Sequence, residues 1–222
     1  MCFSATANFV ASGVIGGIGV AVLPRIRQAR AALFAVTPLL FVLHQFTEGF
    51  VWLGLDGRIG EPAFGHVVFL FMLYAQGVLP LLIPLTVLLM EPPGWRRRAV
   101  AALTAVGGAL AAWVCWAVVA LPTAAFLDHH SIAYRNAGTD HALVGAVYIA
   151  ATCGALLLST HRVVRWFGIL NAAGLAAVLV IRGYAFTSAW CLYAAILSVM
   201  VFWQFSRGHV DVERPNRTLA AD

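Results

Sequence analysis

The sequence predicts an all-α protein: a polytopic transmembrane bundle of seven helices, with the N-terminus outside and the C-terminus in the cytoplasm. Of its 222 residues, 62% are hydrophobic and only 10% are charged. Soluble domains carry about 25% charged residues, so a soluble fold of this length could not bury so much apolar surface. The apolar residues also gather in seven long runs, and the arginines between the runs set the orientation.

Each apolar run is close to the roughly 20 residues that a helix needs to cross the hydrocarbon core of a bilayer. The runs cover residues 5–23, 31–55, 65–90, 99–121, 141–160, 164–182 and 184–205. Pro80 and Pro84 should kink the third run. We therefore expect one seven-helix transmembrane domain over residues 1–207 and a short, disordered cytoplasmic tail over residues 208–222.

Arginine supplies the formal positive charge, because the chain contains no lysine. Eleven arginines fall on one side of the predicted membrane, and three (Arg58, Arg135 and Arg182) fall on the other. Cytoplasmic loops are enriched in arginine, so the first side is predicted to be cytoplasmic. The missing lysine excludes a retinal Schiff base. The scattered arginines do not form a nucleic-acid-binding patch, and the expected surroundings are a lipid bilayer.

Glu48 is the one acidic residue within a predicted span, and ionisable groups in a membrane mark candidate functional sites. His44 lies one helical turn away on the same face, and Trp52 lies on or near that stripe. We interpret Glu48 as a catalytic acid or base or a metal ligand, and His44 as a metal ligand or proton relay. The alternatives are a structural ion pair between Glu48 and Arg182, and a core histidine whose hydrogen bonds are satisfied.

Polar residues recur at helical spacing on the later predicted spans as well. Such stripes cannot face lipid cheaply, so they should converge on a polar cavity that opens to the outside. The residues expected to bind a ligand there are Trp52, Tyr148, Asn171, Arg182 and Tyr184. For Tyr148 an ordinary interhelical hydrogen bond is the alternative.

Two cysteines near the outer side are further candidates. Removal of Met1 would leave the Cys2 thiol beside a free α-amine, a pair that can chelate a metal or act as nucleophile and base. Cys2 is therefore the second catalytic candidate besides Glu48. Cys191 lies near the outer end of the last run, where it could share a metal site or a disulfide with Cys2. Two unpaired cysteines, or an acylated Cys2, are the alternatives.

The long outer connection, about residues 122–140, contains His129 and His130. Histidine is the commonest metal ligand, so these two residues join Cys2, His44, Glu48 and Cys191 as candidate ligands for zinc, copper or iron. Adjacent histidines point in different directions, so one of the two at most is expected to bind in a given site. Solvated loop residues are the alternative interpretation.

Four sequence blocks resemble the signature of a bacterial family of polytopic membrane proteins of unknown function. The blocks are MCFSATANF at 1–9, HQFTEGFVW at 44–52, YIAATC at 148–153 and WCLYAAILS at 190–198. The resemblance extends over nearly the whole chain and implies a location in the bacterial cytoplasmic (inner) membrane. Members of that family often have glutamine in place of His44, which argues against an obligatory ligand there. Glu48, Cys2 and Cys191 match the family pattern.

Three functions stay open at this point. The first is an outer-facing polar cavity that binds a metal or a small ligand, with a membrane-embedded enzyme as one form of it. The second is a proton-coupled transporter or cation channel, although polar residues are sparse in the inner halves of the spans and no inverted repeat is visible. The third is a structural or sensory membrane protein. Whether the chain forms a homo-oligomer is also open.

Overall fold

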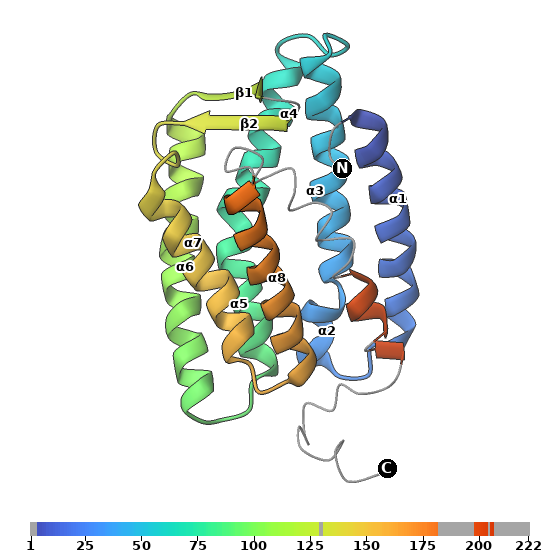
Figure 1. Ribbon diagram of the computed structural model, residues 1–222, viewed down its shortest axis with the longest axis vertical. Helices are drawn as coiled ribbons and strands as arrows, with labels where there is room; N and C mark the ends of the chain where they lie inside the picture. Colours follow the sequence, from blue (N-terminus) through green and yellow to red (C-terminus); the bar gives the residue numbers. More distant parts are fainter. Residues whose placement is uncertain (1–3, 129–130, 182–197, 204, 207–222) are drawn as a thin grey trace.

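Helices packed side by side form most of the molecule in the computed structural model, which describes residues 4–128, 131–181, 198–203 and 205–206. A β-hairpin lies across one end of the helices (Figure 1). The helical elements are α1 Ala5–Val22, η1 Leu23–Arg25, α2 Ala29–Ala35, α3 Thr37–Leu55, α4 Ala63–Met72, η2 Leu73–Val78, α5 Leu79–Met90, α6 Trp95–Ala120, α7 Ala142–Leu158 and α8 Arg162–Ile181.

Four helical stretches of the described chain are long and apolar enough to cross a membrane. They are Ala5–Arg25, Ala29–Leu55, Ala63–Met90 and Trp95–Ala120, and each end lies within four residues of the predicted run. Helices α7 and α8 match the fifth and sixth predicted runs to within two residues. Most of the seventh run lies outside the described residues. The described residues at its end, 198–203 and 205–206, are helical. A seven-span bundle therefore stays a prediction.

The second predicted run is broken between α2 and α3. Pro38, at the start of α3, has no N–H to donate to the carbonyl of Phe34 four residues earlier. The chain leaves helical geometry at Val36, and the Thr37 hydroxyl donates to the carbonyl of Leu33 at 3.4 Å. The break lets α3 set its own direction against α1, beside which it lies (Figure 1).

The third predicted run changes its hydrogen-bond register where the prolines were expected to bend it. Residues Leu73–Val78 form a π-helical segment, η2, and the Leu79 N–H donates to the carbonyl of Tyr74, five residues back. Pro80 follows at once in α5 and cannot donate. The deformation of this span is thus a π-helical segment before Pro80, a feature that is common at functional sites.

The all-α expectation is wrong for the connection between α6 and α7. Strands β1 (Thr123–Asp128) and β2 (Ser131–Asn136) pair antiparallel, with Thr123 opposite Asn136 and Asp128 opposite Ser131. An irregular connection of this length would leave many backbone groups without partners, and pairing the two halves satisfies them. The connection predicted as an outer loop is therefore a hairpin.

Asn136, which is buried, ties the hairpin to the end of α6. Its side-chain amide donates to the carbonyls of Ala117 at 3.1 Å and Leu121 at 3.3 Å. The Leu121 carbonyl follows the last residue of α6 and gains a partner in this amide, while the Ala117 carbonyl gains a second donor beside the Leu121 N–H. The Asn136 side-chain oxygen accepts from the Gly138 N–H at 2.9 Å, which shapes the turn that leads to α7.

Two apolar clusters hold the helices together. Phe34, Met90 and Phe167 are among the buried residues of the cluster at the end opposite the hairpin. Trp52 and Phe71 belong to the cluster near the hairpin. Tyr148 packs against both clusters, and the candidate site lies beside it.

Candidate functional site

The buried face of α3 agrees with the predicted stripe. Thr37, Phe41, His44, Glu48 and Trp52 are all buried, and Glu48 is 0% exposed. This confirms that the lone carboxylate of the second predicted span points into the bundle and not outward, as its desolvation cost requires.

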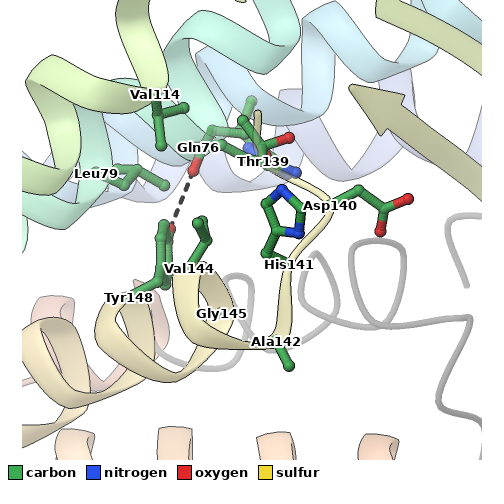
Figure 2. Close-up of a pocket in the computed structure, with 12 residues that line it drawn as sticks. Gln76, Leu79, Val114, Thr139, Asp140, His141, Ala142, Val144, Gly145 and Tyr148 are labelled. Atoms are coloured by element: carbon green, nitrogen blue, oxygen red, sulfur yellow. Dashed lines mark hydrogen bonds between the residues drawn. The ribbon is translucent and has the colours of Figure 1, made fainter. Parts of the chain in front are cut away.

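A cavity of about 320 Å³ lies between η2, α6 and the start of α7 (Figure 2). Its polar lining residues are His44, Gln76, Thr139, Asp140, His141 and Tyr148, and its apolar ones are Ala75, Leu79, Val114, Ala142, Val144 and Gly145. Ligand pockets of proteins are usually apolar with a few polar groups, and their volumes begin at about 300 Å³. The cavity has the size and the lining of a small-molecule pocket.

His44 contributes a buried imidazole to the wall of this cavity. The side chain is 4% exposed, and neither ring nitrogen has a hydrogen-bond partner among the residues described. Its ring packs against Phe71, with ring centroids 4.7 Å apart. A buried polar group without a partner costs about 1–3 kcal/mol, so each such group in a native fold calls for a water or a ligand.

Tyr148 lines the cavity from α7. Its hydroxyl donates to the carbonyl of Ala75 at 3.0 Å, and so joins α7 to the π-helical segment (Figure 2). The alternative interpretation of Tyr148, an interhelical hydrogen bond, is therefore confirmed. Its side chain also forms part of the pocket wall.

A much smaller hollow of about 20 Å³ lies between α3, α5, α7 and α8, where polar residues of the predicted stripes meet. Phe41, Tyr148, Thr152 and Asn171 are part of its lining, and it shares Leu79 and Tyr148 with the larger cavity. The volume suits about one water molecule. The stripes on α3, α7 and α8 thus meet inside the bundle, as expected.

The other predicted site residues divide into two groups. Glu48 and Trp52 line neither of these two hollows, and Trp52 packs in the apolar cluster near the hairpin. The remaining candidates, Cys2, His129, His130, Arg182, Tyr184 and Cys191, lie outside the described residues. The pairing of Glu48 with Arg182 and of Cys2 with Cys191 therefore stays a prediction.

Metal binding finds no support in the part of the chain that the structure describes. No group of three or more histidine, cysteine, aspartate or glutamate side chains there is arranged to hold a metal ion. His44 and His141 both line the cavity, but structural metal sites usually need four ligands.

Gln76 is a pocket residue that was not predicted, whereas His141 belongs to the polar stripe of the fifth predicted span but was not among the residues expected to bind a ligand. Gln76 is an amide within a long apolar run, which is the signal that could have identified it. His141 occupies the position before the first residue of α7, so its ring reaches the mouth of the pocket. The neighbouring Asp140 carboxylate points away from Tyr148 (Figure 2), and the exposed Arg135 lies 3.9 Å from it.

Glu91, a second buried carboxylate, was also missed because it lies in a connection between spans. It is 0% exposed and accepts from the Thr160 N–H at 2.9 Å and the Ser159 hydroxyl at 3.1 Å. Arg97 donates to the Glu91 backbone carbonyl at 2.7 Å. These charge-assisted bonds fasten the α5–α6 connection to the α7–α8 connection, which is a structural role.

The fold and the pocket define a class: a helical bundle whose described residues include four candidate membrane-spanning helices and a cavity lined by a histidine without a hydrogen-bond partner among them. Within that class, the chain belongs to a family of unknown function (DUF6629), which it matches over residues 1–216. This confirms the resemblance to an uncharacterised family. No curated protein and no solved structure matches the chain.

Proposed function

We propose that this protein is a multi-pass membrane protein that binds a small organic molecule in the cavity beside His44. The observation that carries the proposal is the imidazole of His44. It is buried and unpaired among the described residues, and it lines a cavity large enough for a ligand. A ligand that hydrogen-bonds the ring would remove the cost of burying it.

The membrane location is supported by the outer surface of the bundle. Large apolar side chains are exposed along several helices, among them Val10 at 62%, Val119 at 70% and Leu143 at 74%. A soluble monomer rarely exposes apolar surface on this scale, whereas lipid would cover it.

The orientation that we propose has the hairpin outside the cell and seven spans in the bacterial cytoplasmic membrane. Eight of the ten described arginines lie on or beside the α1–α2, α5–α6 and α7–α8 connections, at the end opposite the hairpin (Figure 1). Arg58 and Arg135 lie at the hairpin end. This distribution favours a cytoplasmic location for the arginine-rich end, and the cavity would then open toward the outside.

The lining suggests the chemistry of the ligand. A neutral imidazole offers one donor and one acceptor, and the amide of Gln76 offers both as well. Leu79, Val114 and Val144 provide aliphatic walls. An uncharged, mainly apolar molecule with a hydroxyl or carbonyl group would fit this arrangement.

Binding is better supported than catalysis or metal chemistry. Glu48, the candidate acid or base, is buried one helical turn from His44 but does not line the cavity. A zinc, copper or iron site at His44 would need further ligands from Cys2, His129, His130 or Cys191. We therefore propose a ligand-binding protein and keep the metal as an outcome of the test.

The test is to identify what the purified protein carries. Native mass spectrometry and solvent extraction would detect a bound molecule, and elemental analysis would detect a metal, in the wild type, His44→Leu and His44→Gln. His66→Leu is the matched control, because His66 is exposed on α4. We expect His44→Leu to raise the dissociation constant of the ligand about tenfold, as for the loss of one buried hydrogen bond, and so to lower its occupancy. His44→Gln should retain much of it.

Two results would contradict the proposal. One is equal occupancy in the wild type and His44→Leu. The other is a wild-type protein without any bound molecule whose thermal unfolding temperature rises in His44→Leu, because the cavity would then be an empty one that leucine fills. If the wild type instead carries a stoichiometric metal that both His44 variants lose, the ligand of the cavity is a metal ion and not an organic molecule.

A further inference from the structure

A separate cavity, of about 280 Å³, lies at the opposite end of the bundle from the hairpin. It is formed where η1 leads into α2 and where the described C-terminal residues pack. Its lining residues include two arginines, Arg25 and Arg27, together with Gln28, Phe205 and Ser206. None of the described residues that line it is acidic, and Arg25 and Arg27 each carry a positive charge.

Arg25 is held in place by two contacts. Its guanidinium donates a hydrogen bond to the carbonyl of Ala21, at the end of α1, and lies over the ring of Phe202 with 5.0 Å to the centroid. A guanidinium has five N–H donors, so the bond to Ala21 leaves others for a ligand. A positioned guanidinium loses little side-chain entropy when it binds an anion.

The position of this cavity relative to the apolar helices is also informative. The candidate span Ala5–Arg25 ends at it, and the candidate span Ala29–Leu55 begins beside it. Basic pockets between membrane helices at this depth are typical binding sites for the phosphate groups of anionic lipids.

We infer that the Arg25–Arg27 cavity binds a phosphate-bearing anion, supplied by the headgroup of an anionic phospholipid or by free phosphate. Two guanidinium groups match the charge and the oxygen acceptors of a phosphate. The Ser206 side chain can bind one of its remaining oxygens, and Phe205 provides an apolar wall for attached carbon atoms. This site is separate from the His44 cavity. The anion site does not depend on the proposed function, whereas a lipid source depends on the proposed membrane location.

The experiment uses the full chain in an uncharged detergent. Thermal unfolding is followed during titration with phosphatidylglycerol, with phosphatidylcholine or with inorganic phosphate. The variant Arg25→Gln/Arg27→Gln removes both cavity charges. The matched control, Arg30→Gln/Arg98→Gln, removes two exposed charges at the same end that do not line the cavity.

We expect phosphatidylglycerol or phosphate to raise the unfolding temperature of the wild type and of the control variant with a saturable dependence. The Arg25→Gln/Arg27→Gln variant should bind at least about tenfold more weakly, as for the loss of charge-assisted hydrogen bonds. A response to phosphatidylglycerol but not to phosphate identifies a lipid headgroup. A response to phosphate at equal or lower concentration identifies the free anion.

The inference is overturned if neither anion gives a saturable response in the wild type, or if both double variants lose the response equally. Arg25 also holds the end of α1 through Ala21, so the double variant could lose stability for that reason alone. If it does not fold, Arg27→Gln compared with Arg30→Gln decides the question by the same measurement.

Discussion

The hydroxyl of Tyr148 supplies the hydrogen bond that the backbone of η2 cannot give to Ala75. In an α-helix the Ala75 carbonyl would accept from the N–H of Leu79, but that N–H donates to Tyr74 in the π register. In the π register the donor for Ala75 would be Pro80, which has no N–H. The Tyr148 hydroxyl, 3.0 Å away, occupies the vacant acceptor. The π-helical segment and Tyr148 are therefore joined through the Ala75 carbonyl, and together they form one wall of the His44 cavity.

Tyr148→Phe should lower the free energy of unfolding by about 1–3 kcal/mol, because it leaves the Ala75 carbonyl unpaired inside the bundle. Tyr74→Phe is the matched control. The Tyr74 hydroxyl donates to the carbonyl of Leu40 at 2.8 Å, but that carbonyl lies within α3 and keeps its helical partner. Its loss should cost under about 1 kcal/mol. Urea unfolding in detergent would measure both, and equal costs would refute the account of the vacant acceptor.

Gly107→Ala should destabilise the bundle strongly. A Cβ at this position would lie 1.9 Å from the backbone carbonyl oxygen of Pro80, so α5 and α6 would have to separate. Overpacking of this kind costs about 1–3 kcal/mol or more. At the adjacent Gly108 a Cβ would meet only the Leu81 side chain at 3.5 Å, so Gly108→Ala should be neutral or gain up to about 1 kcal/mol from helix propensity. Thermal unfolding of the two variants compares them, and similar shifts would contradict the close approach.

The sequence predicted the helices well because the length of an apolar run is a local property. The ends of six runs match the observed helices to within four residues. The hairpin was missed because its stability depends on distant groups. Asn136 binds the end of α6, which is 15 to 19 residues away in the chain. No periodicity within residues 122–140 predicts that contact.

The site was predicted in part for a related reason. The stripe that contains His44 and Glu48 follows from helical periodicity, and its burial is confirmed. Periodicity fixes the face of a helix but not which partner helix lies opposite. For this reason Glu48 and Trp52 were expected at the cavity, which Gln76 and His141 line instead.

Glu91→Leu should cost about 3 kcal/mol, because it leaves the Thr160 N–H and the Ser159 hydroxyl without their buried acceptor. Glu91→Gln keeps one oxygen and should cost about half as much. Glu61→Gln is the control. Its carboxylate is exposed and accepts from the Gly65 N–H at 3.1 Å, so the change should stay within about 0.5 kcal/mol. Chemical unfolding of the three variants tests this order, and a Glu91→Leu protein as stable as Glu61→Gln would exclude the proposed fastening of the two connections.

Asn136→Ala should weaken ligand binding in the His44 cavity as well as stability. The Asn136 side chain anchors the hairpin at Ala117 and Leu121, and its backbone carbonyl accepts from the N–H of Thr139 at 3.0 Å, so it places the segment that closes the pocket. The loss of these side-chain bonds should cost about 1–3 kcal/mol and increase proteolysis within the hairpin. Thr123→Val removes one partner of the same amide, at 2.9 Å, and leaves the two helix carbonyls paired. Thr123→Val should therefore weaken ligand binding and stability less than Asn136→Ala does. Limited proteolysis and ligand occupancy, measured together, separate the two roles: cleavage that rises without any loss of occupancy would show that the hairpin does not position the pocket.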